Sequence, residues 1–276
     1  VRRRNAVPYF NIVAETSENT VVTEYEPVKK RSDSYQSEAA LEQEFIRMLC
    51  EQGYEYLPIH TESDLVSNLR RQLEELNHYI FSDTEWEDFF HNAIANPNEH
   101  IVEKTRKIQE DHIQNLRRDD GSTKNITLID KKNIHNNRLQ VINQYVVSTK
   151  DGAKHDNRYD VTVLVNGFPL VHIELKRRGV AIREAFNQIE RYQRESFWSG
   201  SGLYEYIQIF VISNGANTKY YSNSTRWNAE REHKKKGASK TKSSNSFEFT
   251  CFWADANNRV IPDLIDFTKT FFAKHT

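Results

Sequence analysis

The sequence predicts a mixed α/β fold, with a central mixed sheet, helices on both of its sides and an N-terminal helical elaboration. Three observations predict it. Apolar residues recur at helical spacing between residues 35 and 94. After Pro97 the pattern changes to the alternation and β-branched runs that are typical of strands. Residues 157–215 then follow the order strand, turn, strand, helix, buried strand, as in folds where helices pack on a sheet.

The first third of the chain carries the helical signals. Residues 1–34 alternate only weakly and predict an N-terminal arm with one or two short strands. Ser37 suits the N-cap of the first helix, and Gly53 ends it. The helices expected here span residues 38–52, 63–76 and 83–94.

Strand signals dominate the rest of the chain. The clearest is the strand-turn-strand pattern of residues 157–176. The basic, Ser-rich stretch at 230–246 is expected to be a solvated loop. The other expected strands span residues 125–130, 138–147, 206–215, 218–223 and 247–253, and the expected helices span 180–195 and 261–272.

The amino-acid composition limits the classes of protein to which this chain can belong. The 276 residues are 37% hydrophobic and 28% charged, which suffices for one large or two small domains with a real core. Lys and Arg number 38 against 39 Asp and Glu, so a globally basic nucleic-acid binder is excluded, whereas a local basic patch is not. Cys50 and Cys251 are too few for a disulfide framework, and we expect buried free thiols in a reducing cytoplasm. The sequence contains no membrane-span or secretory-signal pattern, which also predicts a cytoplasmic protein without a membrane partner.

The register of the hairpin in residues 157–176 decides which polar side chains meet. Asn166-Gly167 marks the turn, and we expect a three-residue loop over 166–168. This register gathers the apolar residues of both strands on one face, and Pro169 disfavours tight pairing next to the turn. Asp160 then lies directly across from Glu174; a five-residue loop keeps the same register.

Three charged residues at the open end of this hairpin point to metal-dependent chemistry. Glu174 and Lys176 share a strand face, because they are two residues apart. Two close carboxylates repel unless a positive charge lies between them, and Mg²⁺ prefers such oxygen ligands. We therefore expect Asp160, Glu174 and the Leu175 carbonyl to hold Mg²⁺, with Mn²⁺ as an alternative. Lys176 would assist a water or stabilise phosphate charge, as phosphodiester hydrolysis requires. The expected catalytic set is Asp160, Glu174 and Lys176.

The following helix supplies supporting residues. Gln188 and Tyr192 are four residues apart and share a helix face. Nearby arginines are expected to contact the phosphate backbone, which positions DNA without reading its sequence. They are Arg177, Arg178, Arg183 and Arg191.

The order Asp160, Glu174-x-Lys176, Gln188-x-x-x-Tyr192 resembles the PD-(D/E)xK nuclease superfamily in its RecB-like branch. The segments YQSEAALE, TRKIQ, LIDKKN and FVISNG, with the whole window of residues 157–192, resemble the N-terminal nuclease domain of the restriction (R) subunit of type I restriction–modification enzymes. The resemblance begins near Tyr35, so we expect an arm over residues 1–34 and a PD-(D/E)xK-like endonuclease domain over 35–276. Tyr159 stands where the family has proline, and the stretch at 230–246 looks like an insertion.

The resemblance implies Mg²⁺-dependent, sequence-nonspecific cleavage of double-stranded DNA. Family members are several times longer and carry an ATP-driven translocase after the nuclease domain. This chain has no Gly-x-x-x-x-Gly-Lys-Ser/Thr phosphate loop, so it looks like a fragment of a longer subunit, and ATP would act only through the absent motor domains. The implied partners are double-stranded DNA, the methyltransferase and specificity subunits, and the chain's own C-terminal translocase domains.

Other interpretations of the function stay open. The first alternative is a non-catalytic DNA-gripping or docking module that couples the translocase to the methyltransferase and specificity subunits. A nuclease directed at RNA or single strands is the second, although we see no aromatic stacking platform that would favour it.

Several residues also have alternative roles. Asp160 could form only a strand-end salt bridge with Lys176, and Gln188 and Tyr192 could belong to an ordinary half-buried helix face. Glu38 and Glu42 are either a helix carboxylate near the metal or exposed acids of a first turn. A packed or polar role for His172 is favoured over a metal role. The other two acid-x-Lys triplets, at 130–132 and 232–234, are interpreted as structural and solvated, respectively.

Overall fold

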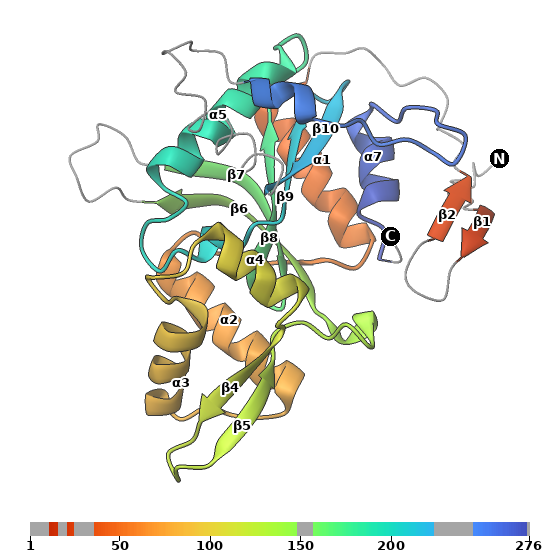
Figure 1. Cartoon of the computed structure of the whole chain (residues 1–276). Helices are drawn as coiled ribbons and strands as arrows, with labels where there is room; N and C mark the ends of the chain where they lie inside the picture. The colour runs from red at the N-terminus through yellow and green to blue at the C-terminus, as the bar shows by residue number, and fades with distance from the viewer. Residues whose placement is uncertain (1–10, 16–20, 25–35, 148–156, 224–244, 275–276) are drawn as a thin grey trace, which may run out of the picture.

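The structure is a computed structural model that describes residues 11–15, 21–24, 36–147, 157–223 and 245–274. A six-stranded mixed sheet forms its centre, with the strand order β10-β9-β8-β7-β6-β3 (Figure 1). Its strands are β3 (Glu55–Tyr56), β6 (Leu139–Val147), β7 (Asn157–Val165), β8 (Phe168–Leu175), β9 (Ile209–Ser213) and β10 (Thr218–Ser222). The α-helices are α1 (Glu38–Glu51), α2 (Glu62–Asn77), α3 (Asp83–Phe89), α4 (Ile101–Gln109), α5 (Ile182–Glu195) and α7 (Leu264–Phe271).

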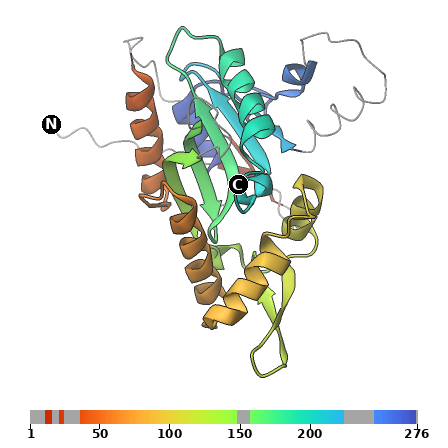
Figure 2. The same cartoon turned by 90° about the vertical axis from the view of Figure 1, so that its left-hand side faces the viewer.

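Helices cover both faces of the sheet, so the predicted fold class is confirmed. One face carries α1 and α7, whose Phe45 and Phe267 pack with Val161 and Ile173 of the central hairpin. The opposite face carries α5, and its hydrophobic cluster continues into α2 and α3. Figure 2 shows the sheet between α1 and α5. No helix within the described ranges is long and apolar enough to cross a membrane.

A second group of elements extends from one end of the sheet. Helices α2, α3 and α4 lie there beside the hairpin of β4 (Ile113–Arg117) and β5 (Thr123–Thr127) (Figure 1). This is the predicted helical elaboration, although the sequence predicted neither α4 nor β4. The third predicted helix ends as a π-helical turn, η1 (Phe90–Ile94). Short 3-10 turns are η2 (Ile134–Asn136), η3 (Leu203–Tyr206) and η4 (Asn245–Phe249).

The N-terminal arm contains two short strands, as predicted. They are β1 (Asn11–Glu15) and β2 (Val21–Glu24), which pair antiparallel in a sheet of their own. The basic stretch at 230–246 falls almost entirely outside the described residues.

The β7–β8 turn corrects one prediction and confirms another. The loop has two residues rather than three: Val165 pairs with Phe168, and Asn166 and Gly167 have φ of 51° and 83°. Two positive φ angles are typical of the type I′ turn, which Asn-Gly favours. A β-bulge after Val163 then shifts the register by one residue. The bulge restores the predicted pairing, in which Val161 opposes Ile173.

Two further predictions are wrong. Residues 247–253 do not form a strand. They begin in the 3-10 turn η4 and contribute one isolated bridge, between Cys251 and Tyr220. The turn places the Phe247 ring 5.4 Å from that of Phe186, so packing on α5 competes with strand formation. Cys50 and Cys251 are free as predicted, but both are exposed rather than buried.

Candidate active site

The open end of the β7–β8 hairpin brings the three predicted catalytic residues together. The register of β7 and β8 ends at the pair of Val161 and Ile173, and Asp160 and Glu174 are the next residues of the two strands. Oδ2 of Asp160 accepts a hydrogen bond from the Leu175 backbone N–H at 2.9 Å. Nζ of Lys176 donates to Oε1 of Glu174 and to the Leu175 carbonyl, both at 3.0 Å. The carbonyl predicted as a ligand therefore lies beside both carboxylates.

Burial makes this cluster electrostatically unusual. Glu174 is fully buried and Asp160 is half-buried. Burial, and then repulsion from Glu174, raises the pKa of Asp160 to about 7. Burial also raises the pKa of Glu174 to about 7, against the lowering influence of Lys176. Burial would lower the pKa of Lys176, but the charges of Glu174 and Asp160 outweigh it and raise that pKa, so Lys176 stays an ammonium at neutral pH.

The donor set fits a hard divalent cation. Oε2 of Glu174 is buried and has no hydrogen-bond partner within the described residues. Two carboxylates and one carbonyl are oxygen ligands of the type Mg²⁺ takes together with waters. The described ranges contain no group of three His, Cys, Asp or Glu side chains that could hold a metal ion. Asp160, Glu174 and the Leu175 carbonyl are the predicted ligands that the structure brings together here.

His172 lies directly behind Glu174 on β8. It is fully buried, and its Nε2 is 3.6 Å from Oε2 of Glu174. Neither ring nitrogen has a hydrogen-bond partner within the described part of the chain. The rings of Tyr159, Tyr192 and Phe197 surround it at 5.5–6.1 Å between centroids. Burial lowers the pKa of His172 to about 4, so the ring is neutral at pH 7. The packed role favoured from sequence is confirmed, and it includes contact with a carboxylate of the site.

Gln188 and Tyr192 form one hydrogen-bonded unit on α5. Nε2 of Gln188 donates to the Tyr192 hydroxyl, which in turn donates to the Arg158 carbonyl at 2.8 Å. The unit therefore ties α5 to the strand that carries Asp160. Burial, and then the negative charge of Glu174, raises the pKa of Tyr192 to about 12. These contacts connect α5 to β7, and the supporting role of both residues at the site stays a prediction.

The four arginines spread around the site rather than converging on it. Arg177, Arg183 and Arg191 are exposed. The Arg183 guanidinium lies 4.4 Å from the centre of the Phe247 ring, and that of Arg191 lies 5.3 Å from the centre of Tyr192. Arg178 is 4.0 Å from the Asp263 carboxylate. Their role toward DNA stays a prediction.

The two acids of α1 have different environments. Glu38 is exposed, lies in the first turn and accepts a hydrogen bond from the Arg177 backbone N–H at 3.3 Å. Glu42 is buried, and its oxygens accept from Nδ2 of Asn143, at 2.6 Å, and from Nε2 of Gln144. The description of an exposed first-turn acid therefore fits Glu38 and is wrong for Glu42. Sequence reasoning missed Gln144, since nothing in the sequence marks its φ of 52°.

The remaining acid-x-Lys triplets lie apart from this site. Asp130 accepts hydrogen bonds from the backbone N–H groups of Lys132 and Asn133, both at 2.9 Å, and so organises a turn. The structural interpretation of that triplet is confirmed. The triplet at 232–234 lies outside the described residues.

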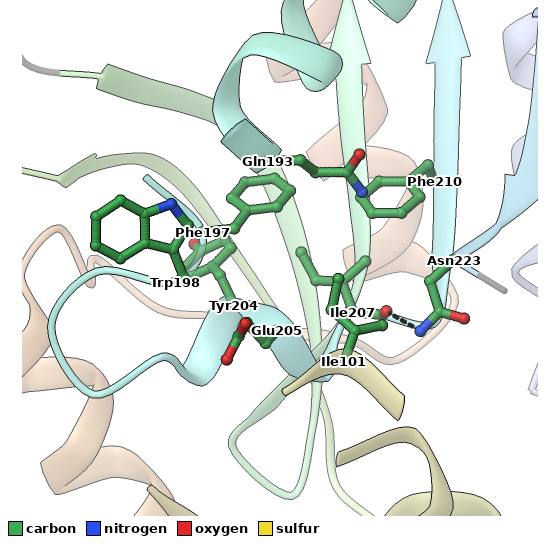
Figure 3. A pocket seen from close by; sticks show the side chains of 9 residues that line it. All are labelled: Ile101, Gln193, Phe197, Trp198, Tyr204, Glu205, Ile207, Phe210 and Asn223. Atoms are coloured by element: carbon green, nitrogen blue, oxygen red, sulfur yellow. Dashed lines mark hydrogen bonds between the residues drawn. The ribbon is translucent and has the colours of Figure 1, made fainter. Parts of the chain in front are cut away.

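A small cavity adjoins the C-terminal end of α5. It measures about 30 Å³, which leaves room for only one or two waters. Gln193, Trp198 and Ile101 are among the residues that line it (Figure 3). Its size excludes a nucleotide.

Comparison with known proteins decides the family. Residues 35–229 match the family described as type I restriction enzyme R protein N terminus. The chain belongs to this family. It is 47% identical to the type I restriction enzyme EcoprrI endonuclease subunit of Escherichia coli, over 96% of this chain and 79% of that protein. It is 38% identical to the SsaAORF53P endonuclease subunit of Staphylococcus saprophyticus, over 86% of this chain but 23% of that protein.

Membership of the type I restriction R-protein family confirms the resemblance inferred from the sequence. The matched region includes Asp160, Glu174 and Lys176. Both relatives are named endonuclease subunits, so the prediction of a restriction endonuclease is confirmed at the level of the family. The chain spans about a quarter of the length of the staphylococcal relative.

Proposed function

We propose that this chain is a Mg²⁺-dependent nuclease domain of a type I restriction enzyme, cleaving double-stranded DNA without sequence preference. The placement of Asp160 across a hairpin from Glu174, with Lys176 hydrogen-bonded to Glu174, is the observation that carries the proposal. Lys176 offsets only part of the cost of placing these two carboxyl groups side by side, since the pKa of each stays raised to about 7, and a bound cation would offset the rest. Family membership supports the same conclusion.

Each residue has a role that follows from its environment. Asp160, Glu174 and the Leu175 carbonyl would hold the cation, which when bound lowers the pKa of a coordinated water and offsets phosphate charge. Lys176 is an ammonium, so it serves as a donor and positive charge rather than a base. It can orient the attacking water or stabilise the phosphorane-like charge of the transition state. Gln188 and Tyr192 keep α5 fixed over β7.

The proposed assembly follows from the family. Methyltransferase and specificity subunits would select the DNA, and translocase domains of the longer subunit would use ATP. The exposed Arg177, Arg183 and Arg191 are suited to the phosphate backbone. In the alternative, the chain is a docking module without chemistry of its own. The raised pKa values of two juxtaposed carboxyl groups favour the nuclease, because perturbed groups of this kind cluster at functional sites.

Calorimetry with Mg²⁺ or Mn²⁺ tests the proposal, in the presence of a short DNA duplex that supplies phosphate oxygens. We expect binding to be lost in Asp160→Ala and retained in Lys176→Ala. Lys132→Ala is the matched control, because it alters an acid-x-Lys triplet that organises only a turn. Absence of binding by the wild-type chain would favour the docking module. Cleavage of supercoiled plasmid, single-stranded DNA and RNA by the chain in its complex then separates the substrate classes.

A further inference from the structure

The strand next to Asp160 contains an unusual backbone conformation. Gln144 of β6 has a φ of 52°, in the left-handed region that a residue with a Cβ atom rarely adopts. Its position is directly opposite Asp160, because β6 pairs Asn143 with Val161 and Tyr145 with Tyr159. Gln144 and Asp160 form no pair in this otherwise regular ladder. The distortion in β6 therefore coincides with the residue proposed to hold the metal.

The neighbouring strand is distorted at the same place. Tyr159 and Val161 are two residues apart and should share a face of β7. Instead Tyr159 joins the hydrophobic cluster under α5, whereas Val161 joins the cluster under α1 and α7. The regular alternation of β7 thus breaks at Asp160, whose Oδ2 turns to the Leu175 N–H of β8.

Glu42 holds the distorted segment of β6 from the side of α1. It is only 8% exposed, and one carboxylate oxygen accepts from Asn143 while the other accepts from Gln144. Hydrogen bonds to an ionised acceptor are stronger than those between neutral groups. Two further contacts also hold Asn143. The Tyr56 hydroxyl donates to its Oδ1 at 2.9 Å, and Nδ1 of His60 lies 3.1 Å from its carbonyl oxygen. Strained backbone persists where the surrounding structure fixes it in this way.

We propose that Glu42 is a positioning residue. Its two hydrogen bonds to the side-chain amides of Asn143 and Gln144, which we call the clamp, fix the left-handed backbone of Gln144. The clamp thereby keeps Asp160 against Leu175 and Glu174. The inference rests on the proposed nuclease function. Glu42 acts without touching the cation, because both of its oxygens are engaged by amide donors. Gln144 contributes through its backbone conformation and its amide N–H₂ group, while its Oε1 is buried without a partner in the described residues.

The clamp makes a specific prediction about rescue. In Glu42→Ala both side-chain oxygens are lost, so the amides of Asn143 and Gln144 have no acceptor on α1 and the clamp opens. Gln144→Gly removes the need for a clamp, because glycine adopts positive φ without strain. We expect Glu42→Ala to weaken Mn²⁺ binding about 10-fold or more, as for other residues that orient metal ligands. Glu42→Ala with Gln144→Gly should return to within about 3-fold of wild type.

A readout that needs no metal separates this inference from the proposed function. The Leu175 amide donates to Asp160, so its hydrogen-exchange rate in the metal-free 276-residue chain reports whether Asp160 is in place. We expect exchange to accelerate in Glu42→Ala and in Asp160→Ala, and to slow again in Glu42→Ala with Gln144→Gly. Glu51→Ala is the matched control, since it removes an exposed acid of the same helix.

Two results would overturn the clamp. One is wild-type Leu175 exchange and wild-type Mn²⁺ affinity in Glu42→Ala. The other is a defect that Gln144→Gly fails to rescue, which would make Glu42 either a direct ligand or a general structural residue. If the wild-type chain binds no Mn²⁺ but the exchange pattern is as expected, the clamp stands and the proposed nuclease function fails.

Discussion

The two ends of the β7–β8 hairpin differ in how their polar groups are satisfied. At the turn, the buried Asn166 accepts from the Arg138 N–H and donates to the carbonyl of Leu128 and to Oδ1 of Asn137, at 2.8–3.0 Å. At the open end, both ring nitrogens of His172 and Oε2 of Glu174 are buried without hydrogen-bond partners in the described residues, although Nε2 and Oε2 lie 3.6 Å apart. Buried polar groups are normally paired, and the exceptions require an explanation. The hydrogen bonds at the turn stabilise the fold, whereas the unpaired groups at the open end are consistent with the proposed cation site.

The largest effect should come from the carboxylates of the open end. We expect Asp160→Asn and Glu174→Gln each to reduce DNA cleavage by the assembled enzyme about 10³-fold or more, since several kcal/mol of transition-state stabilisation depend on the cation. The same substitutions should not destabilise the metal-free chain, because each removes a buried like charge. Plasmid cleavage and urea denaturation measure the two effects. Near-wild-type cleavage in both variants would place the chemistry elsewhere.

The pH dependence of stability should also distinguish the two ends. Asp160 and Glu174 have pKa values raised to about 7 in the folded chain. A carboxyl group whose pKa is higher in the folded than in the unfolded chain stabilises the fold while it is protonated. This stabilisation is complete below the unfolded pKa, near 4, and is lost as pH rises through about 7. We expect the metal-free chain to lose roughly 2–4 kcal/mol between pH 4.5 and 8, counting the pair together.

Denaturation curves at several pH values measure this loss. Affinity for Mn²⁺ should change in the opposite direction and rise through the same range, because the cation needs both carboxylates ionised. The Asp160→Asn variant is the control, and its stability should depend less on pH. A flat profile in the wild-type chain would contradict the pKa shifts.

Substitution at the turn should affect stability alone. Asn166→Ala removes three hydrogen bonds from a buried site and places alanine at positive φ, so we expect a loss of about 2–3 kcal/mol. Mn²⁺ affinity of the folded protein should stay within about 2-fold of wild type. A large loss of affinity would show that the two ends of the hairpin are coupled.

The smallest effect should come from His172. His172→Phe keeps a ring among Tyr159, Tyr192 and Phe197 but removes the nitrogen that faces Glu174. We expect about 10-fold weaker Mn²⁺ binding with unchanged or slightly higher stability, because the orphaned nitrogens disappear. His172→Gln retains a donor and should bind more tightly than His172→Phe. Calorimetry and denaturation of both variants test this order.

The sequence predicted the pairing at the site better than the local structure that produces it. Asp160 lies across from Glu174 because apolar side chains on one face determine the register of a hairpin. The prediction of the turn was wrong, since a two-residue turn with a bulge gives the same pairing beyond Val163 as a three-residue loop. Hydrophobic alternation therefore predicts the register of the strands, but it does not predict the turn length or the bulge that produces this register.

The missed helix α4 shows a second limit. Lys104 is only 2% exposed, yet its charge hides it from any search for apolar periodicity. Its ammonium pairs with Glu205 and donates to the Gly202 carbonyl, both at 2.9 Å. Such long-range partners are invisible in the local sequence. The same reason explains why the amides that surround Glu42 could not be predicted.

The position of Lys176 determines which positive charges a bound cation would displace from the site. Its ammonium already bonds to Glu174 and to the Leu175 carbonyl, which are two of the three groups offered to a cation. Near neutral pH the paired carboxyl groups retain part of a proton as well. Lys176 and this shared proton therefore act as the counterions of the two carboxyl groups, and binding of a cation would replace them. The heat of Mn²⁺ binding should accordingly vary with the ionisation enthalpy of the buffer, because the released proton is taken up by the solution.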